Sequence, residues 1–322
     1  MRAIVYTGAG GPEVISVRDV PDPVAGPGQV VVRVRAAGLN RADLIQRRGG
    51  YPAPPGWPAD IPGLEYAGVV ETLGEGVAGV APGDRVMGLV GGGAQAERVA
   101  VPAGELLRIP ERLTDPEAAA VPEAFLTAYD ALAVRGRVAR GERVLIHAVG
   151  SGVSTVAVQL AKWMGAAVVG TSRTATKLEA AARLGLDEGI DTSARGFAEA
   201  LVAPVDVVLD FFGGPALAEN LAALRSKGRL VLLGTMQGPK AADVDVGRIL
   251  RGRLEVIGSV MRSRPPAERV ALVEEFRTRV LPAVADGTLA PIIGETFAME
   301  DVVRAHEAME ANRVFGKIVL RW

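Results

Sequence analysis

The order of hydrophobic and polar positions along the chain changes near residue 116. From residue 1 to about 117, short β-branched runs such as AIVY, VVVRV and YAGVVETLG are separated by glycine and proline. This pattern predicts a β-rich, barrel-like first domain. From Glu142 onward, apolar runs typical of buried strands alternate with helical segments. That alternation predicts a doubly wound parallel sheet, and therefore an α/β fold class.

The strands of the predicted parallel sheet are nearly continuous apolar runs, as expected where both faces of a strand are buried. We expect them at residues 144–148, 167–171, 205–210, 229–234 and 254–259. After Arg264 the alternation stops, and two helical patterns lead to a final strand, GKIVLRW. We expect this tail to return to the first domain and complete its sheet. The predicted division of the 322 residues is therefore 1–120 with 264–322 in one domain and 121–263 in the other.

The segment VLIHAVGSGVSTVAVQLAKW runs from a buried strand through a glycine-containing turn into a helix. Glycines at such a turn let the backbone approach a pyrophosphate, and the first turn of the helix offers unpaired N–H groups. The residues assigned to this turn are Gly150, Ser151, Gly152 and Val153. The turn departs from the usual glycine fingerprint because serine or alanine stands at Ala148, Ser151 and Ser154. An ordinary turn of a parallel sheet remains the alternative.

The end of the second predicted strand reads Thr171, Ser172, Arg173, without the acidic residue that commonly binds the ribose 2′-hydroxyl of NAD. Ser172 and Arg173, with Lys177 about one turn into the next helix, are suited to a 2′-phosphate. This favours NADPH over NADH. The alternative is that Arg173 and Lys177 are solvated residues at the start of a helix.

The charges nearly cancel, with 36 basic and 37 acidic residues, so no overall field favours nucleic acid or an anionic membrane as a partner. No apolar run reaches bilayer length, and the first residues lack the pattern of a secretory signal, so we expect a cytoplasmic protein. The absence of cysteine excludes thiolate metal sites. Of the two histidines, His147 is expected to be a satisfied core residue and His306 to lie on a late helix, neither with a catalytic role.

Several motifs in the same order resemble one family. They are AAGLNRADLIQRRGGYPAPP, PGLEYAGVV, VAPGDRVMGL, PEAFLTAYDAL, the glycine turn and HEAMEANRVFGKIVL. Together they resemble the zinc-free, zeta-crystallin-like NADPH quinone oxidoreductases of the medium-chain dehydrogenase/reductase superfamily. The resemblance implies a GroES-like barrel as catalytic domain and a Rossmann domain for NADPH. In zinc alcohol dehydrogenases of this superfamily a Cys occupies the place of Asn40 and a His that of Leu64, so it implies a reaction without metal.

The same resemblance implies the catalytic residues. Asn40, Asp43 and Tyr51 are expected to border the nicotinamide and the substrate, with Tyr51 as the candidate to hydrogen-bond or protonate a substrate oxygen. Thr127, in PEAFLTAYD, is expected against the nicotinamide. Each assignment has a structural alternative: Asn40 as a helix cap, Asp43 as an acid in the first turn of a helix, and Tyr51 as a residue that packs a loop.

Loops that follow later strands complete the implied cofactor site. Its further members are Phe211, Gly234, Thr235, Val260, Met261, Arg262 and Asn312. Thr192 stands where many relatives place a tyrosine that contacts the cofactor, which leaves part of the 2′-phosphate site open.

The function expected from these features is an NADPH-dependent quinone oxidoreductase, with hydride and single-electron transfer not distinguished by the sequence. One alternative is an NADPH-dependent alkenal or enone double-bond reductase. Another is a protein that binds NADPH in a regulatory role with weak catalysis. The resemblance also implies a homodimer, for which the apolar segment LEVIGSVM is a candidate edge strand.

Overall fold

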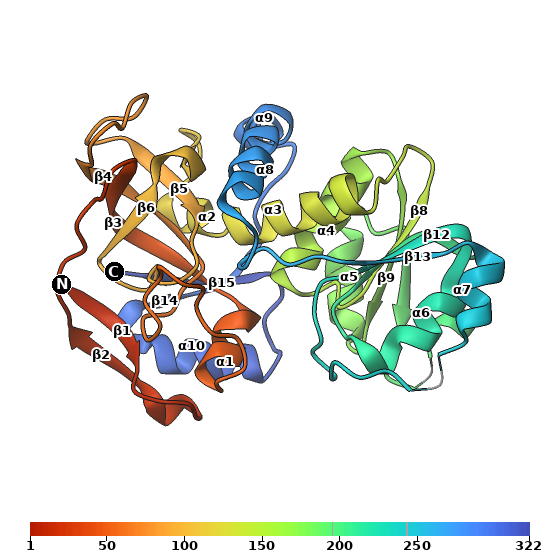
Figure 1. The fold of residues 1–322 in the computed structure, drawn as a ribbon. Helices are drawn as coiled ribbons and strands as arrows, with labels where there is room; N and C mark the ends of the chain where they lie inside the picture. Colours follow the sequence, from red (N-terminus) through yellow and green to blue (C-terminus); the bar gives the residue numbers. More distant parts are fainter. Residues whose placement is uncertain (195, 243) are drawn as a thin grey trace. The chain divides into compact units, whose positions relative to one another are not determined.

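The computed structural model describes residues 1–194, 196–242 and 244–322. Its internal contacts divide the chain into two compact units (Figure 1). Unit 1 comprises Met1–Leu126 and Met261–Trp322, and unit 2 comprises Thr127–Val260. Residues 121–126 and 261–263, at the predicted boundaries, therefore lie with unit 1. The predicted combination of a β-rich domain with a doubly wound parallel sheet is confirmed.

Unit 1 is built around a sheet in the order β14-β15-β3-β4-β5-β7, with β6 paired to β3. The strands are β3 (Gln29–Leu39), β4 (Glu65–Leu73), β5 (Arg85–Leu89), β6 (Arg98–Pro102), β7 (Leu107–Arg108), β14 (Ile293–Ala298) and β15 (Lys317–Arg321). β1 (Arg2–Tyr6) and β2 (Ile15–Asp19) form a separate antiparallel pair. The tail strand β15 pairs antiparallel with β3, which confirms that the end of the chain returns to the sheet of the first domain.

The helices of unit 1 include α10 (Val302–Glu310), whose Val302, Ala305 and Ala308 share an apolar core with the strands. The others are α1 (Arg41–Arg47), α2 (Asp115–Ala119), α8 (Pro266–Arg279) and α9 (Leu281–Ala285). α3 (Pro122–Tyr129) begins in unit 1 and continues into unit 2. The returning segment is held to the rest of unit 1 by polar and aromatic contacts: Arg269 Nη2 donates to Glu105 Oε1 at 2.8 Å, and Phe276 packs edge-on against Phe125.

Unit 2 contains a parallel sheet in the order β10-β9-β8-β11-β12-β13. Its strands are β8 (Arg143–Ile146), β9 (Ala167–Ser172), β10 (Glu188–Asp191), β11 (Val205–Asp210), β12 (Leu224–Leu232) and β13 (Glu255–Gly258). Its helices are α4 (Gly152–Trp163), α5 (Ala175–Ala182), α6 (Leu217–Ala223) and α7 (Val246–Gly252), and residues Asp130–Arg135 form a π-helix.

The predicted strands of unit 2 are all present, but three details of the prediction were wrong. β8 ends at Ile146 because Ala148 adopts a left-handed conformation, with φ of 50°, which an extended strand cannot contain. β12 begins at Leu224 rather than at Arg229, across an irregular pairing with β11. β10 was not predicted, because it is short and lies at the edge of the sheet, where only Ile190 of its four residues is buried.

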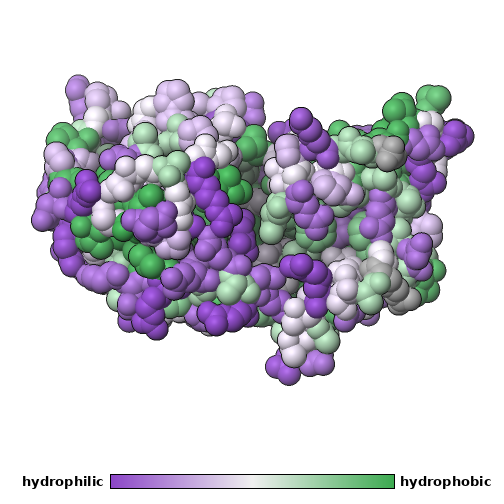
Figure 2. Space-filling view, turned by 90° about the horizontal axis from the view of Figure 1, so that it is seen from below, coloured by the Kyte–Doolittle hydropathy of each residue, from purple (hydrophilic) through white to green (hydrophobic). Residues whose placement is uncertain are grey.

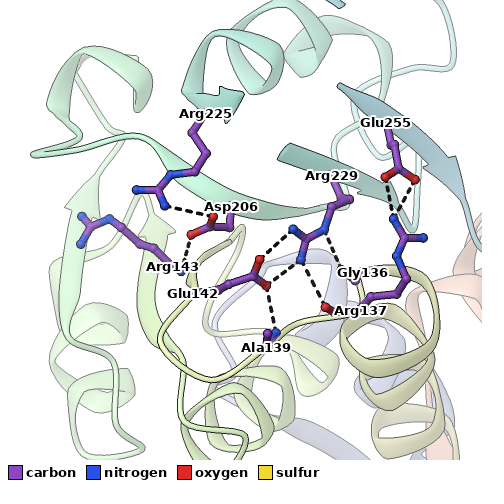
Figure 3. A network of polar contacts seen from close by, with 9 residues as sticks. All are labelled: Gly136, Arg137, Ala139, Glu142, Arg143, Asp206, Arg225, Arg229 and Glu255. Atoms are coloured by element: carbon purple, nitrogen blue, oxygen red, sulfur yellow. Dashed lines mark hydrogen bonds and ion pairs between the residues drawn. The ribbon is translucent and has the colours of Figure 1, made fainter. Parts of the chain in front are cut away.

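A network of polar contacts fastens the amino-terminal end of this sheet (Figure 3). Arg229 donates to both carboxylate oxygens of Glu142, at 2.8 and 2.6 Å, and Arg137 donates to Glu255 at 2.6 Å. Asp206 accepts from the backbone N–H of Arg143 at 2.8 Å. In a parallel sheet, ligands bind at the opposite, carboxyl-terminal edge. This network therefore joins neighbouring strands at the edge away from the usual ligand position.

The surface shown in Figure 2 mixes hydrophilic residues with small hydrophobic areas. Within the described part of the chain, no helix combines the length and apolarity needed to cross a bilayer.

Candidate functional site

The turn between β8 and α4 is held by its own hydrogen bonds. The carbonyl of Ala148 accepts from the backbone N–H of Ser151 at 2.8 Å. Ser151 is the N-cap of α4, where its Oγ accepts from the N–H of Ser154 at 3.1 Å. α4 begins at Gly152, as the sequence predicted. The turn therefore presents the start of a 12-residue helix at the carboxyl edge of the sheet, the usual place for a bound pyrophosphate.

Ser154 shows how this turn dispenses with the third glycine of the usual fingerprint. The residue is fully buried where α4 packs on β8. Glycine is usual at this position because a side chain would push the helix away from the strand. Its Oγ donates to the carbonyl of His147 at 2.8 Å and accepts from Ser151 Oγ at 2.7 Å. The hydroxyl thus replaces the close glycine contact with a hydrogen bond to the strand.

Gly150 is needed for close packing against Lys177. A Cβ atom added at Gly150 would lie 2.5 Å from Cδ of Lys177, well inside van der Waals contact. Lys177 is itself buried, with 8% of its surface exposed. The glycine therefore allows the aliphatic part of this lysine to lie against the turn between β8 and α4, where a cation would suit an anionic ligand.

The end of β9 provides the other residues predicted for the 2′-phosphate. Ser172 is buried and its Oγ accepts from the N–H of Thr174 at 3.1 Å, while Arg173 is exposed. Thr192 follows the adjacent strand β10, and its N–H donates to the Ser172 carbonyl at 2.9 Å. Asp191, which the sequence reasoning did not weigh, pairs in register with Ser172. Its carboxylate accepts from the side chain and backbone N–H of Ser193, which hold the pKa of Asp191 below its usual range.

The later loops also converge on this edge. Phe211 follows β11, and its carbonyl accepts from the N–H of Met236 at 3.0 Å. Gly234 lies so close to Phe211 that an added Cβ would be 3.1 Å from the Phe211 carbonyl oxygen. Thr235 and Val260 are exposed beyond the ends of β12 and β13. Unit 2 thus gathers the predicted residues of five strand ends along one edge.

Thr127 supplies a direct test of whether these residues fit a cofactor. Its Oγ1 is buried and has no hydrogen-bond partner within the described residues. Leaving a buried hydroxyl unsatisfied costs about 1–3 kcal/mol, which a polar ligand atom would recover. The orphaned hydroxyl, the helix start at Gly152 and the cations Arg173 and Lys177 together fit a dinucleotide.

In unit 1, Asn40 and Asp43 have the capping roles that the sequence left open. Asn40 is the N-cap of α1, and its backbone N–H donates to Asp43 Oδ2 at 2.8 Å. The other oxygen, Oδ1, accepts from the N–H of Gly63 at 3.2 Å. Burial raises the pKa of Asp43 to about 6, although these backbone bonds and the charges of Lys317 and Arg262 oppose the shift.

The carboxamide of Asn40 is held in a buried polar cluster, which we define as Asn40, Glu65 and Lys317. Lys317 Nζ donates to Asn40 Oδ1 at 2.6 Å and also binds Glu65 Oε1. Asn40 Nδ2 donates to Glu65 Oε1 at 3.0 Å. Glu65 is fully buried and Lys317 is 3% exposed. The amide oxygen of Asn40 is thus occupied by an internal ammonium group.

Tyr51 is positioned by Arg262. The Arg262 guanidinium lies 5.0 Å from the centre of the Tyr51 ring and donates to the Tyr51 carbonyl at 2.6 Å. It also donates to the Gly91 carbonyl at 2.7 Å and to Gln46 Oε1 at 2.8 Å. Arg262, predicted to bind the cofactor, therefore has three acceptors inside unit 1 and fixes the loop that carries Tyr51.

The remaining predicted residues are placed as follows. Met261 is buried in unit 1. Asn312 is exposed after α10 with φ of 52°, a left-handed conformation for which asparagine is suited irrespective of any ligand. His147 is fully buried, with its ring nitrogens 2.9 Å from Thr171 Oγ1 and 2.7 Å from Asn220 Oδ1. Its place as a satisfied core residue is confirmed.

His306 also belongs to the interior of unit 1. Its Nδ1 lies 3.1 Å from Arg47 Nη1, and its Nε2 lies 3.5 Å from the hydroxyl of Tyr6. Burial, followed by the charge of Arg47, lowers the pKa of His306 to about 3. The neutral ring is therefore held between Arg47 and Tyr6 in the interior of unit 1.

Three residues near the predicted site were missed. Glu65 and Lys317 complete the buried polar cluster, and Glu123 lies beside it, its backbone N–H donating to Glu65 Oε2 at 2.7 Å. The sequence held a signal for two of them. Glu65 interrupts the apolar run PGLEYAGVV, and Lys317, one of only five lysines, stands in the final apolar strand. Charged residues in such runs are rarely buried unless they are paired. Across the described residues, no group of three or more His, Cys, Asp or Glu side chains is arranged to hold a metal ion.

Comparisons with known proteins agree with this architecture. Residues 26–111 match the family model of the alcohol dehydrogenase GroES-like domain, and residues 152–279 match that of zinc-binding dehydrogenase. The human synaptic vesicle membrane protein VAT-1 homolog is 33% identical, over 99% of this chain and 86% of that protein.

Two solved structures extend the likeness over the whole chain. A quinone oxidoreductase of Pseudomonas syringae pv. tomato is 30% identical with a TM-score of 0.90, covering 100% of this chain and 99% of that one. The quinone oxidoreductase of Escherichia coli complexed with NADPH is 26% identical with a TM-score of 0.90, covering 100% of both chains. The chain belongs to the medium-chain dehydrogenase/reductase superfamily, within its zinc-free, quinone oxidoreductase-like family of NAD(P)-dependent oxidoreductases.

Proposed function

We propose that this protein is an NADPH-dependent quinone oxidoreductase that works without a metal. The observation that carries the proposal is the carboxyl edge of unit 2, where Ser172, Arg173 and Lys177 border the phosphate-binding turn. Two cations there favour a 2′-phosphate over a 2′-hydroxyl. Asp191 pairs with Ser172 at the same edge. A preference for NADPH over NADH therefore requires that the attraction of Arg173 and Lys177 for the 2′-phosphate exceed its repulsion by Asp191.

The nature of the acceptor follows from the residues of unit 1. Asn40 and Leu64 replace the metal ligands of zinc-dependent relatives, so an alcohol substrate would lack Lewis-acid stabilisation of its alkoxide. Quinones accept reducing equivalents without such help because conjugation spreads the incoming charge. Bound NADPH would supply the hydride, and the protein would orient it and provide a proton. The quinone oxidoreductases among the similar structures support this choice of acceptor.

The test is NADPH oxidation by the full chain with a panel of ortho- and para-quinones and 2-alkenals, repeated with NADH. The proposal expects faster turnover of quinones, with kcat/KM for NADPH above that for NADH. Preference for 2-alkenals would assign the protein to double-bond reduction. Tight NADPH binding without turnover of any acceptor would favour a regulatory protein.

We also propose a homodimer formed through β13. This strand is the last of its sheet, so one side of its backbone is unpaired within the sheet. Val256 is 42% exposed on β13, and Val246 and Leu250 are 69% and 77% exposed on the preceding helix α7. Gel filtration should give a dimer that Val256→Lys weakens, and a monomeric wild type would contradict this assembly.

A further inference from the structure

Glu123 lies beside the buried polar cluster of Asn40, Glu65 and Lys317. It lies in the first turn of α3 and is half-buried. Within the described residues, no hydrogen bond or ion pair to its carboxyl group is present, in contrast to Glu65 and Asp43. A carboxyl group that is partly exposed and unpartnered can take up a proton from water and pass it on.

The charges around Glu123 oppose its ionisation. Glu65 on β4 lies against its backbone, with the 2.7 Å bond from the Glu123 N–H to Glu65 Oε2 fixing the approach. Burial and then repulsion by Glu65 raise the pKa of Glu123 to about 7, with a smaller contribution from Asp43 on α1. Lys317 on β15 and Arg262 before α8 act in the opposite direction. Glu123 therefore exchanges a proton near neutral pH, as a general acid should.

Two neighbouring groups are less suited to this role. Burial, followed by the nearby Glu123 carboxylate, raises the pKa of Tyr51 to about 12, so the phenol keeps its proton and serves as a hydrogen-bond donor. Asp43 is fully buried and both of its oxygens accept backbone N–H groups. These bonds hold the carboxylate inside unit 1, where it has no access to solvent from which to regain a proton.

We propose that Glu123 is the acid that protonates the reduced acceptor, while Tyr51 donates a hydrogen bond to the acceptor oxygen and Arg262 holds Tyr51 in place. This inference rests on the proposed function. Hydride from NADPH carries two electrons and one proton to the quinone, oxidising NADPH to NADP⁺ and forming the hydroquinone anion. The O–H bond of Glu123 breaks as the new O–H bond of the hydroquinone forms, and the carboxylate regains its proton from water.

The test compares the wild type with Glu123→Gln and Glu123→Asp in NADPH oxidation by one ortho-quinone and one para-quinone across pH 5 to 9. We expect kcat of the wild type to fall as pH rises through about 7. Glu123→Gln should lose about 10²-fold or more in kcat, together with that pH dependence. Glu123→Asp should recover part of the rate, with the midpoint moved to lower pH because aspartic acid is the stronger acid. Glu111→Gln, an exposed site in unit 1, is the matched control and should behave as wild type.

NADPH fluorescence titration of each variant distinguishes loss of the acid from loss of the fold. Glu123→Gln should bind NADPH with unchanged Kd if its fold is intact. Wild-type turnover combined with an unaltered kcat and midpoint in Glu123→Gln would overturn the role of Glu123 alone. Absence of turnover by the wild type with every acceptor would overturn the proposed function, and the role of Glu123 with it.

Discussion

The two regions that carry the site are built in opposite ways. The carboxyl edge of unit 2 consists of backbone turns at consecutive strand ends, and residues such as Gly150 and Ser151 lie next to one another in sequence. The buried polar cluster of unit 1 consists of side chains, and its hydrogen bond between Lys317 and Asn40 joins residues 277 positions apart. The first region is specified by a local motif, whereas the second exists only once the tail strand β15 has paired with β3.

This difference implies that the two regions respond differently to substitution. A backbone site tolerates side-chain changes that preserve the turn, and its energetics are local. A buried ion pair depends on every partner, because removing one leaves an uncompensated charge in a medium of low polarity. The predictions that follow test this contrast, beginning with the side chains of unit 1.

Lys317→Met should have the largest effect. It leaves the Glu65 carboxylate fully buried without a cation and removes the donor to Asn40 Oδ1. Loss of one partner of a buried pair costs about 3–5 kcal/mol, so thermal and denaturant unfolding should show a strongly destabilised protein. The double variant Lys317→Met with Glu65→Gln should recover most of that loss, since no unpaired charge remains.

The matched control is the exposed pair of Lys162 and Asp187 in unit 2, whose side chains are 37% and 44% exposed. Lys162→Met should cost less than about 1 kcal/mol, as surface pairs do. Equal losses from Lys162→Met and Lys317→Met would contradict the view that burial makes the cluster of unit 1 indispensable.

Glu123→Gln should stabilise the protein in alkaline solution. The pKa of Glu123 is raised in the folded state to about 7 from an ordinary value of 4.5, so stability is present below pH 4.5 and is lost as pH rises through about 7. Glutamine avoids that loss, which should amount to about 3 kcal/mol at pH 8 and less than about 1 kcal/mol at pH 5. Thermal unfolding at both pH values measures it, and an equal change at pH 5 and pH 8 would indicate a packing effect rather than titration.

The fold could be predicted largely from the sequence because it depends on local periodicity. Residues 205–210 were assigned as a strand and β11 has these bounds, since a strand buried on both faces leaves a continuous apolar run. The missed strand β10 has one buried residue in four and leaves no such run. The end of β8 was misplaced because the left-handed φ of Ala148 has no signal in the residue type.

The candidate site could be predicted only in part. The glycine turn and Arg173 stand in one local motif, and the resemblance to a family supplied Tyr51 and Thr127. The contact of Glu65 with Glu123 depends on how β4 meets the start of α3, 58 residues later, which no spacing rule describes. The same limit applies to Arg262, because its three acceptors lie in segments more than 170 residues before it.

Arg173→Ala tests the carboxyl edge of unit 2 through an exposed cation. Loss of a charge-assisted hydrogen bond to a 2′-phosphate should raise the Kd for NADPH about tenfold, or roughly 1.4 kcal/mol, and leave the Kd for NADH nearly unchanged. Fluorescence titration with both nucleotides gives the ratio. Arg183→Ala, at the C-cap of α5, the helix that follows Arg173, is the control and should change neither value. A parallel loss of NADPH and NADH affinity would place Arg173 against the pyrophosphate instead.

Ala148→Gly is expected to change the free energy of unfolding least of these variants, and to increase it. Ala148 has φ of 50°, which costs a non-glycine residue about 1–2 kcal/mol, and glycine removes that strain. The gain is partly offset by the greater freedom of glycine in the unfolded chain, about 0.4–1 kcal/mol. Unit 2 should therefore become more stable by a few tenths of a kcal/mol up to about 1. Ala180→Gly in the interior of α5 should instead lose about 1 kcal/mol.

The NADPH affinity of the Ala148→Gly variant decides what the small stability change means. If the turn binds the cofactor through its backbone, glycine at position 148 preserves the donors at the start of α4, and the Kd for NADPH should stay within about twofold of wild type. A large rise in Kd accompanied by higher stability would show that the strained alanine holds the turn in its binding conformation. The strain at Ala148 would then be required for cofactor binding by unit 2. In that case this region would depend on a single side chain, as the cluster of unit 1 does.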